Sequence, residues 1–146
     1  QPHHRRLESA VERALSTFGA CLLLDCHSFP SRPLPSEPDQ SLPRPEICLG
    51  TDPYHTPQWL SQTAAGLFQM EGFEVEMNRP YSGTLVPMPY YRKERRVWAL
   101  MVEVRRDLYM DEETGAKLRC FQDTRDRISR ALTALVEEVG VRLGLP

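Results

Sequence analysis

Apolar positions along the chain alternate between the spacing of a helix and the spacing of a buried strand. From His4 to Phe18 they recur every three or four residues, which predicts an amphipathic helix that ends at Gly19. Residues 20–25 and residues 96–104 are largely apolar without a break, which is typical of strands buried in parallel sheets. The pattern therefore begins as a helix followed by a buried strand.

Two shorter strands and two further helices complete the predicted order. Residues 46–50 form a short apolar strand, and strict alternation over residues 73–77 predicts a half-exposed strand, a candidate edge of the sheet. Thr56 is a candidate N-cap for a helix over residues 57–70, and a long helix is expected over about residues 118–143. Helix–strand–strand–helix–strand–strand–helix is an α/β order with crossover connections.

Composition places the chain among globular proteins and excludes several functions. Its 146 residues are 40% hydrophobic and 26% charged with a formal net charge of −2, which fits a single domain over residues 1–146. The chain has no excess of basic residues, so its charge does not indicate a nucleic-acid partner. Every apolar run is shorter than the roughly 20 residues that a membrane-spanning helix needs. These numbers leave the oligomeric state open.

The four cysteines are scattered and form no CxxC pair, which disfavours a thiolate zinc site. The polar, basic first residues also show no apolar segment of a signal peptide, so a reducing, cytoplasmic setting is expected. Nine of the thirteen prolines lie in two long loops, residues 30–45 and 78–91, each of which follows a predicted strand. Long loops of this kind are often functional.

Residues with chemical potential follow three of the predicted strands. Asp25, His27 and Ser28 follow the first long apolar run, Glu103 lies near the end of the second, and Asn78 opens the loop after the alternating strand. Ligands of open α/β sheets bind at the carboxyl ends of the strands. Imidazole suits zinc, and a carboxylate beside a metal-bound water is a natural general base.

Each of these residues also has a purely structural interpretation. His27 could be a buried histidine bound to Asp25, and Glu103 could form an ion pair with one of three arginines, Arg79, Arg105 or Arg106.

Cys26 suggests a cysteine nucleophile, but neighbouring residues of a strand point to opposite faces. If His27 faces the site, Cys26 is expected to face the core.

Three other polar positions are expected to be structural. His55 fits a loop or capping residue, and Asp52 fits an Asx turn ahead of Pro53. The acidic run Asp111–Glu113 resembles a cluster for a hard cation but is more typical of plain surface.

Four segments in order, residues 24–30, 47–52, 78–84 and 101–110, together resemble the N-formylglutamate amidohydrolase family. They read LDCHSFP, ICLGTD, NRPYSGT and MVEVRRDLYM, and the resemblance extends over about residues 1–115. It implies a three-layer α/β sandwich with a mostly parallel mixed sheet, similar to the zinc carboxypeptidases.

The resemblance also implies residue roles. His27 would be a ligand of Zn²⁺, supported by Asp25 and Ser28, and Glu103 would be the general base. The loop from residue 78 to residue 86 would close over the substrate. The implied candidate substrate-binding residues in this loop are Asn78, Arg79 and Tyr81. Arg105 is a further candidate: the pair Arg105-Arg106 could be part of the substrate pocket or, as the equal alternative, form a salt-bridge network with Asp107.

The chain departs from the pattern that the resemblance implies. Such zinc hydrolases also use a His-x-x-Glu pair, and no histidine here has glutamate three positions later. The expectation is that the chain lacks an N-terminal portion of the domain and is inactive by itself, with one zinc ligand.

Three functions are therefore compared. The first is a zinc amidohydrolase that converts the small molecule N-formylglutamate to glutamate and formate. The alternative is a non-catalytic α/β binding domain, or an inactive fragment, that retains the scaffold without a complete metal site. The third is a cysteine hydrolase that uses Cys26.

Overall fold

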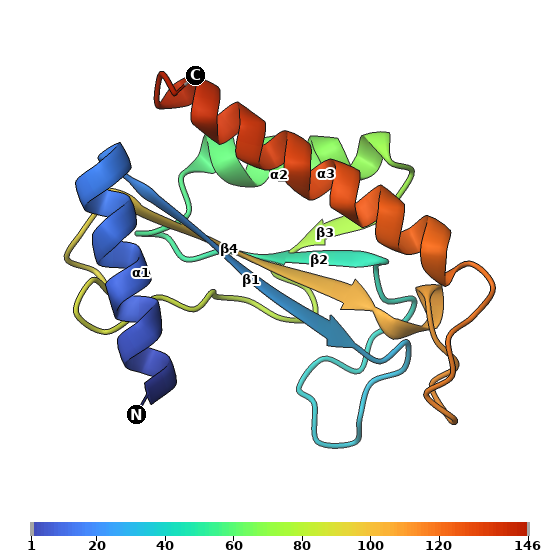
Figure 1. Cartoon of the computed structure of the whole chain (residues 1–146). Coiled ribbons are helices and arrows are strands. Elements are labelled where there is room, and N and C mark those ends of the chain that lie inside the picture. The colour runs from blue at the N-terminus through green and yellow to red at the C-terminus, as the bar shows by residue number, and fades with distance from the viewer. Residues whose placement is uncertain (1, 146) are drawn as a thin grey trace.

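A computed structural model describes residues 2–145 (Figure 1). Three helices, four strands and one short 3-10 helix follow in the order α1 (Pro2–Phe18), β1 (Cys21–Phe29), β2 (Ile47–Gly50), α2 (Gln58–Met70), β3 (Val75–Met77), β4 (Val97–Arg105), η1 (Arg106–Leu108) and α3 (Phe121–Arg142). Each predicted helix and strand is present, with ends shifted by a few residues.

The strands form one mixed sheet in the order β1-β4-β2-β3. β1 runs parallel to β4 and β3 runs parallel to β2, whereas β2 runs antiparallel to β4. β3 lies at an edge of the sheet, as its alternation predicts. The sheet is therefore mixed and mostly parallel, which confirms the expected fold class.

β1 differs from its prediction in two respects. It lies at the other edge of the sheet, so Leu22 and Leu24 are only partly buried rather than fully enclosed. It also continues past Asp25 to Phe29, because all nine of its residues pair with the nine residues of β4. His27 therefore lies within the strand and not in the loop that follows it.

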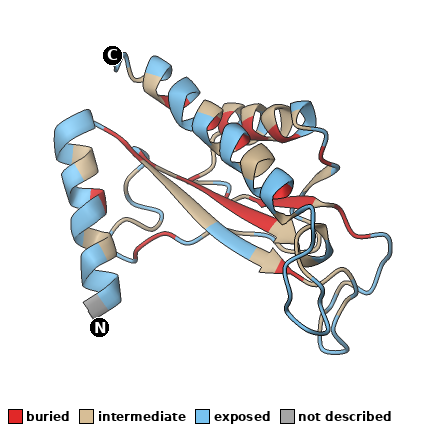
Figure 2. Cartoon of the chain, turned by 45° about the vertical axis from the view of Figure 1, so that its right-hand side comes forward, coloured by how far each residue is buried: buried red, intermediate tan, exposed pale blue. Residues whose placement is uncertain are grey.

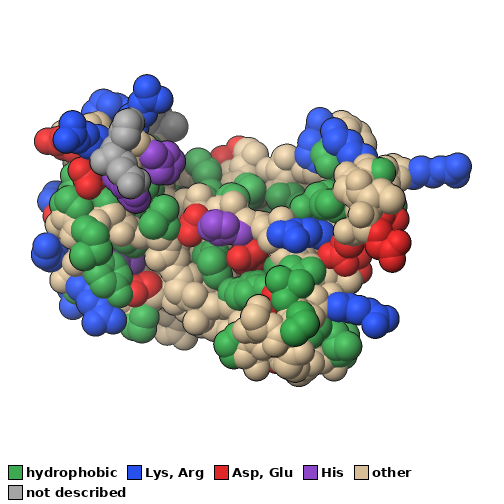
Figure 3. Space-filling view, turned by 90° about the horizontal axis from the view of Figure 1, so that it is seen from below, with side chains coloured by type: hydrophobic (Ala, Val, Ile, Leu, Met, Phe, Trp, Pro, Cys, Tyr) green, Lys and Arg blue, Asp and Glu red, His purple; other side chains and the backbone are tan. Residues whose placement is uncertain are grey.

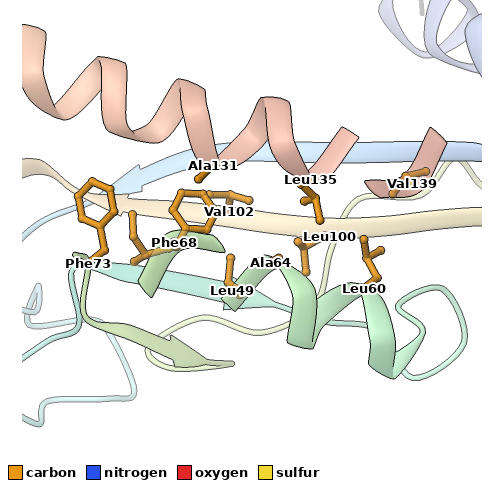
Figure 4. Packing of buried hydrophobic residues seen from close by; sticks show 11 residues of the cluster. Leu49, Leu60, Ala64, Phe68, Phe73, Leu100, Val102, Ala131, Leu135 and Val139 are labelled. Atoms are coloured by element: carbon orange, nitrogen blue, oxygen red, sulfur yellow. The ribbon is translucent and has the colours of Figure 1, made fainter. Parts of the chain in front are cut away.

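Helices cover both faces of the sheet and make three layers. α2 and α3 cover one face, where Leu100 and Val102 of β4 meet Leu60 of α2 and Leu135 of α3 (Figure 4). On the opposite face Val11 of α1 packs with three residues near the starts of the two long strands, Cys21, Val97 and Ala99. Most of β4 is buried, whereas the middle of β1 is exposed (Figure 2).

The turn before α2 holds two of the residues considered above. The Asp52 carboxylate accepts hydrogen bonds from the backbone N–H groups of Tyr54 and His55, which confirms the Asx turn. Thr56 is not the N-cap: its hydroxyl donates to the Ala99 carbonyl at 2.6 Å, and Pro57 occupies the cap position without a side-chain hydrogen bond. The Thr56 side chain thus joins this turn to β4.

His55 is completely buried and lies in this loop, as expected. Its Nδ1 lies 2.8 Å from the Val97 carbonyl oxygen, and its Nε2 accepts the Arg92 N–H at 2.9 Å. Both ring nitrogens therefore hold backbone groups, which gives His55 a structural role.

Within residues 2–145, no helix combines the length and hydropathy of a membrane-crossing segment.

Candidate active site

Asp25, His27 and Glu103 lie on one face of the sheet, the face opposite α2 and α3. Side chains alternate along a strand, and Leu100 and Val102 pack toward the two helices. Glu103 therefore points to the opposite face, together with its register partner His27. Figure 3 shows this face, with a histidine and acidic side chains grouped near its centre.

His27 and Asp25 form a direct pair. The His27 Nε2 lies 2.8 Å from the Asp25 Oδ1, and the second Asp25 oxygen accepts the Leu85 N–H at 3.2 Å. The interpretation of His27 as a buried histidine is wrong, because 51% of its side chain is exposed, although it does bind Asp25. Within residues 2–145 its Nδ1 has no hydrogen-bond partner. A histidine with one nitrogen on a carboxylate and the other free is typical of a metal ligand.

Glu103 is buried without a charged partner in contact. Only 8% of the residue is exposed, and within residues 2–145 its Oε2 has no hydrogen-bond partner and its carboxylate forms no ion pair. Burial raises the pKa of Glu103, the positive charges of His27 and Arg106 oppose that rise, and the negative charge of Asp25 adds to it. The expected ion pair with an arginine is therefore not formed, and the carboxylate remains available to a ligand.

Cys26 points away from this site but does not face the core. It is exposed, because β1 is an edge strand and this part of it is left uncovered. Partial burial and then the charge of Asp25 raise the pKa of its thiol. A raised pKa reduces the thiolate population that a cysteine nucleophile needs.

Ser28 is tied to Arg106 rather than to the His27–Asp25 pair. Its hydroxyl accepts the Arg106 Nε–H at 3.2 Å, and its carbonyl accepts an Nη2–H of the same guanidinium at 3.0 Å. Support of the His27 ring by Ser28 stays a prediction. The sequence analysis left Arg106 open between the salt-bridge network and the substrate pocket; in the structure it bonds to Ser28, and its charge acts on Glu103.

Asn78 and Arg79 hold backbone and loops together. Asn78 has a φ of 56°, and its side-chain oxygen accepts the Thr51 N–H at 2.8 Å just beyond β2. The Arg79 guanidinium donates to Glu76 at 2.7 Å and to the Pro43 carbonyl at 2.8 Å. Asp39 adds a second carboxylate 3.4 Å from the Arg79 Nε. Most of the Arg79 charge is thereby compensated inside the protein.

Tyr81 belongs to a buried polar cluster that the sequence analysis missed. Its hydroxyl donates to Glu37 at 2.8 Å, and Glu37 also pairs with Arg44, which is only 2% exposed. The Arg44 guanidinium lies 5.8 Å from the centre of the Phe29 ring. Nothing in the local sequence signals this burial, because Arg44 lies in the proline-rich loop.

Arg105 takes part in the salt-bridge network that was its alternative role. Its Nε donates to Asp107 at 2.7 Å, and its Nη1 donates to the Arg44 carbonyl. The acidic run nearby acts as structure: the Asp111 carboxylate accepts the Thr114 N–H at 2.8 Å, and Glu112 accepts the Ser31 N–H at 2.9 Å. A substrate contact from Arg105 stays a prediction.

The donor set fits zinc only in part. His27 supplies an imidazole with a supporting carboxylate. Within the described residues, however, no three histidine, cysteine, aspartate or glutamate side chains gather as a metal-binding group. Residues 2–145 thus offer one strong ligand, and a complete site needs others.

The fold and site together define a three-layer α/β domain with an imidazole and a buried carboxylate on neighbouring strands. Comparison with known proteins is consistent with this description. The family profile described as N-formylglutamate amidohydrolase matches residues 1–110. The chain belongs to the N-formylglutamate amidohydrolase family, which confirms the resemblance.

Two relatives carry the same name or a close one. N-formylglutamate deformylase of Pseudomonas aeruginosa is 30% identical over 114 residues, which are 77% of this chain and 42% of that protein. The crystal structure of N-formylglutamate amidohydrolase from Ralstonia eutropha JMP134 superposes with a TM-score of 0.77 at 29% identity. That superposition covers 99% of this chain and 51% of the relative. The chain therefore spans about half the length of the relatives it matches.

A second solved structure supports the fold alone. A gene product of Agrobacterium tumefaciens superposes with a TM-score of 0.56 at 17% identity, over 92% of this chain and 50% of that one.

Proposed function

We propose that this chain forms part of an amidohydrolase that cleaves the amide bond of N-formylglutamate to release glutamate and formate. The carrying observation is the buried Glu103 carboxylate, whose Oε2 has no partner within residues 2–145, beside the His27–Asp25 pair. An unpartnered buried carboxylate costs stability, so its place beside an imidazole favours a catalytic role. The names of the two half-matched relatives support the choice of substrate.

His27 is the proposed zinc ligand within the described residues, and Asp25 orients its ring. The Asp25 carboxylate holds Nε2, which leaves Nδ1 for the metal. Zinc bound there would polarise the substrate carbonyl and lower the pKa of a coordinated water. The remaining ligands would come from residues outside those described, since residues 2–145 contain no group of three candidates.

Glu103 is the proposed general base. Burial raises the pKa of Glu103 above its ordinary value, which makes its carboxylate a stronger base. The carboxylate would take a proton from water at Oε2 and pass it to the departing amide nitrogen. Its position deep on β4 keeps bulk water from competing for that proton.

The loop after β3 is proposed to form one wall of the substrate pocket. Leu85 donates its N–H to Asp25, so the loop lies against the site. In this proposal Asn78, Arg79 and Tyr81 hold the shape of the wall, because their polar groups bind other parts of the protein. A cytoplasmic location is proposed with this function, in line with the free state of all four cysteines.

The test is zinc content measured together with formate release from N-formylglutamate. Both are measured for this chain and for the full open reading frame in which its sequence occurs. We expect the full protein to bind zinc and release formate, and His27→Ala to abolish both. His4→Ala on the exposed side of α1 is the matched control and should leave both unchanged.

The alternative is a binding domain without catalysis. The missing three-ligand group within residues 2–145 favours it. A full-length protein that binds no zinc and releases no formate, yet still binds N-formylglutamate, would establish this alternative.

A further inference from the structure

Arginines close to the site differ in how their charge is balanced. Three of them contact a carboxylate: Arg44 pairs with Glu37, Arg79 with Glu76 and Arg105 with Asp107. Arg106 forms no ion pair within residues 2–145, and its only hydrogen-bond partner there is Ser28. Arg106 therefore keeps a positive charge that no contacting group neutralises.

Arg106 is also the arginine whose charge acts on the catalytic carboxylate. Arg106 directly follows β4 and lies two positions beyond Val104. The register partner of Val104 is Ser28, which is next to His27 in β1. The charge of Arg106 lowers the pKa of Glu103 against the effect of burial.

The two bonds to Ser28 fix the orientation of the guanidinium. A planar guanidinium has five N–H donors, and the edge formed by Nε and Nη2 is occupied by the hydroxyl and carbonyl of Ser28. The other edge, formed by Nη1 and the second Nη2 hydrogen, has no partner within the described residues. Two parallel donors on a fixed edge match the two oxygens of a carboxylate.

We propose that Arg106 binds a carboxylate of the substrate through this free edge and that Ser28 positions it. The inference rests on the proposed function and names the residue that selects an acidic substrate. Asp25 and Glu103 place negative charge at the proposed site, which would repel an anionic substrate. The positive charge of Arg106, which acts on Glu103, would offset that repulsion.

The test compares Arg106→Gln and Arg106→Lys with the natural protein, using the full open reading frame. Loss of a charge-assisted bidentate contact should raise KM for N-formylglutamate by about ten- to a hundred-fold, with a much smaller change in kcat. Lysine keeps the charge but not the fork, so its effect should be intermediate. Arg130→Gln, which removes an exposed arginine paired with Glu71 on the helix side, is the control and should leave KM unchanged.

Substrate analogues identify which carboxylate is bound. N-formylglutamine lacks the side-chain carboxylate, and the α-amide of N-formylglutamate lacks the other. The analogue that lacks the bound carboxylate should be a poor substrate of the natural protein and equally poor for Arg106→Gln. If Arg106→Gln instead lowers kcat/KM for both analogues as much as for N-formylglutamate, the carboxylate role is wrong.

Ser28→Ala tests the positioning role. It removes the hydroxyl that accepts the Nε–H, and it should raise KM a few-fold while the pH profile of kcat stays unchanged. An unchanged KM would remove Ser28 from the proposal.

Failure of this inference can be told apart from failure of the proposed function. If the natural protein hydrolyses N-formylglutamate and Arg106→Gln keeps its KM, the function stands and the inference falls. If no variant releases formate, the hydrolase proposal falls. Calorimetric titration with N-formylglutamate then tests the role of Arg106. If Arg106 binds the substrate carboxylate, the natural protein and Arg130→Gln should bind N-formylglutamate, and Arg106→Gln should bind it more weakly.

Discussion

His27 of β1 and Glu103 of β4 are direct register partners in two parallel strands, and both point to the sheet face opposite α2 and α3. Neighbouring strands lie only about 4.8 Å apart, so the imidazole and the carboxylate share one small volume. Residues 76 positions apart in the chain thus meet by strand pairing alone. In the proposed function, where His27 binds the metal and Glu103 is the base, the two residues need no movement of the backbone to act together.

Glu103→Gln should abolish activity and stabilise the protein at neutral pH by about 1 kcal/mol, the order expected for an unsatisfied buried polar group. Because burial raises the folded-state pKa of Glu103 above its ordinary 4.5, the fold favours the protonated acid. The contribution of Glu103 to stability is fully present below pH 4.5 and is lost as the pH rises through the raised pKa.

Urea unfolding near pH 7.5 and near pH 4 measures this effect. The advantage of Glu103→Gln should shrink at the lower pH, and Glu138→Gln on the exposed face of α3 should show no such trend. If Glu103→Gln is less stable than the natural protein at neutral pH, the prediction that the buried Glu103 carboxylate destabilises the fold is wrong.

Asp25→Asn should weaken zinc binding about 10- to 100-fold, because the amide no longer holds the His27 ring as a carboxylate does. Competition against a chromophoric chelator measures the affinity in the zinc-loaded full protein. The control is Asp126→Asn in α3, where the aspartate pairs with Arg125 on the surface. Equal affinities for natural protein and Asp25→Asn would separate Asp25 from the metal.

Gly50→Ala should destabilise the protein and displace the loop after β3. A Cβ at Gly50 would overlap the carbonyl oxygen of Gly83 and the Met101 side chain, and the backbone oxygen cannot move aside cheaply. Gly66→Ala is a matched control within α2, where no neighbouring atom lies within 4 Å of the added Cβ.

Thermal unfolding of both glycine variants gives the comparison. Gly66→Ala should gain roughly 0.5–1 kcal/mol from helix propensity, whereas Gly50→Ala should lose stability. Stabilisation by both substitutions would show that the loop does not press against the end of β2.

Arg44→Ala should cost about 3–5 kcal/mol, because it leaves Glu37 without its partner in a mostly buried position. Burial by itself would raise the pKa of Glu37, but hydrogen bonds from Arg44 and Tyr81 lower that pKa below its ordinary value. Urea unfolding measures the loss, with the exposed Arg96→Ala as control. A loss of stability below 1 kcal/mol would mean that the cluster of Arg44, Glu37 and Tyr81 does not hold the two loops together.

Cys26→Ser should retain hydrolysis, because Cys26 points to the opposite face from His27 and the pKa of its thiol is raised. Formate release before and after treatment with iodoacetamide checks this. Loss of activity in Cys26→Ser, with zinc binding intact, would revive the cysteine-hydrolase hypothesis.

Local patterns of the sequence predicted the elements, the α/β class, the exposed edge at β3 and the opposite faces of Cys26 and His27. All of these follow from the period of a helix or strand, which acts over neighbouring residues only. Family membership was also predictable, since four separate motifs in order carry it. Sequence also singled out Glu103, because a carboxylate within an apolar strand is unusual.

Tertiary structure alone decided which charges are free. Arg79, Arg105 and Arg106 are all arginines close to candidate site residues in the sequence, yet among the described residues 2–145 the first two contact carboxylates and Arg106 bonds only to Ser28. The burial of Arg44, the edge position of β1 and the exposure of Cys26 likewise depend on strand order and loop packing. Such contacts join residues tens of positions apart, and no local period records them. The availability of a charge to a ligand is therefore a property of the fold, and the residue type does not determine it.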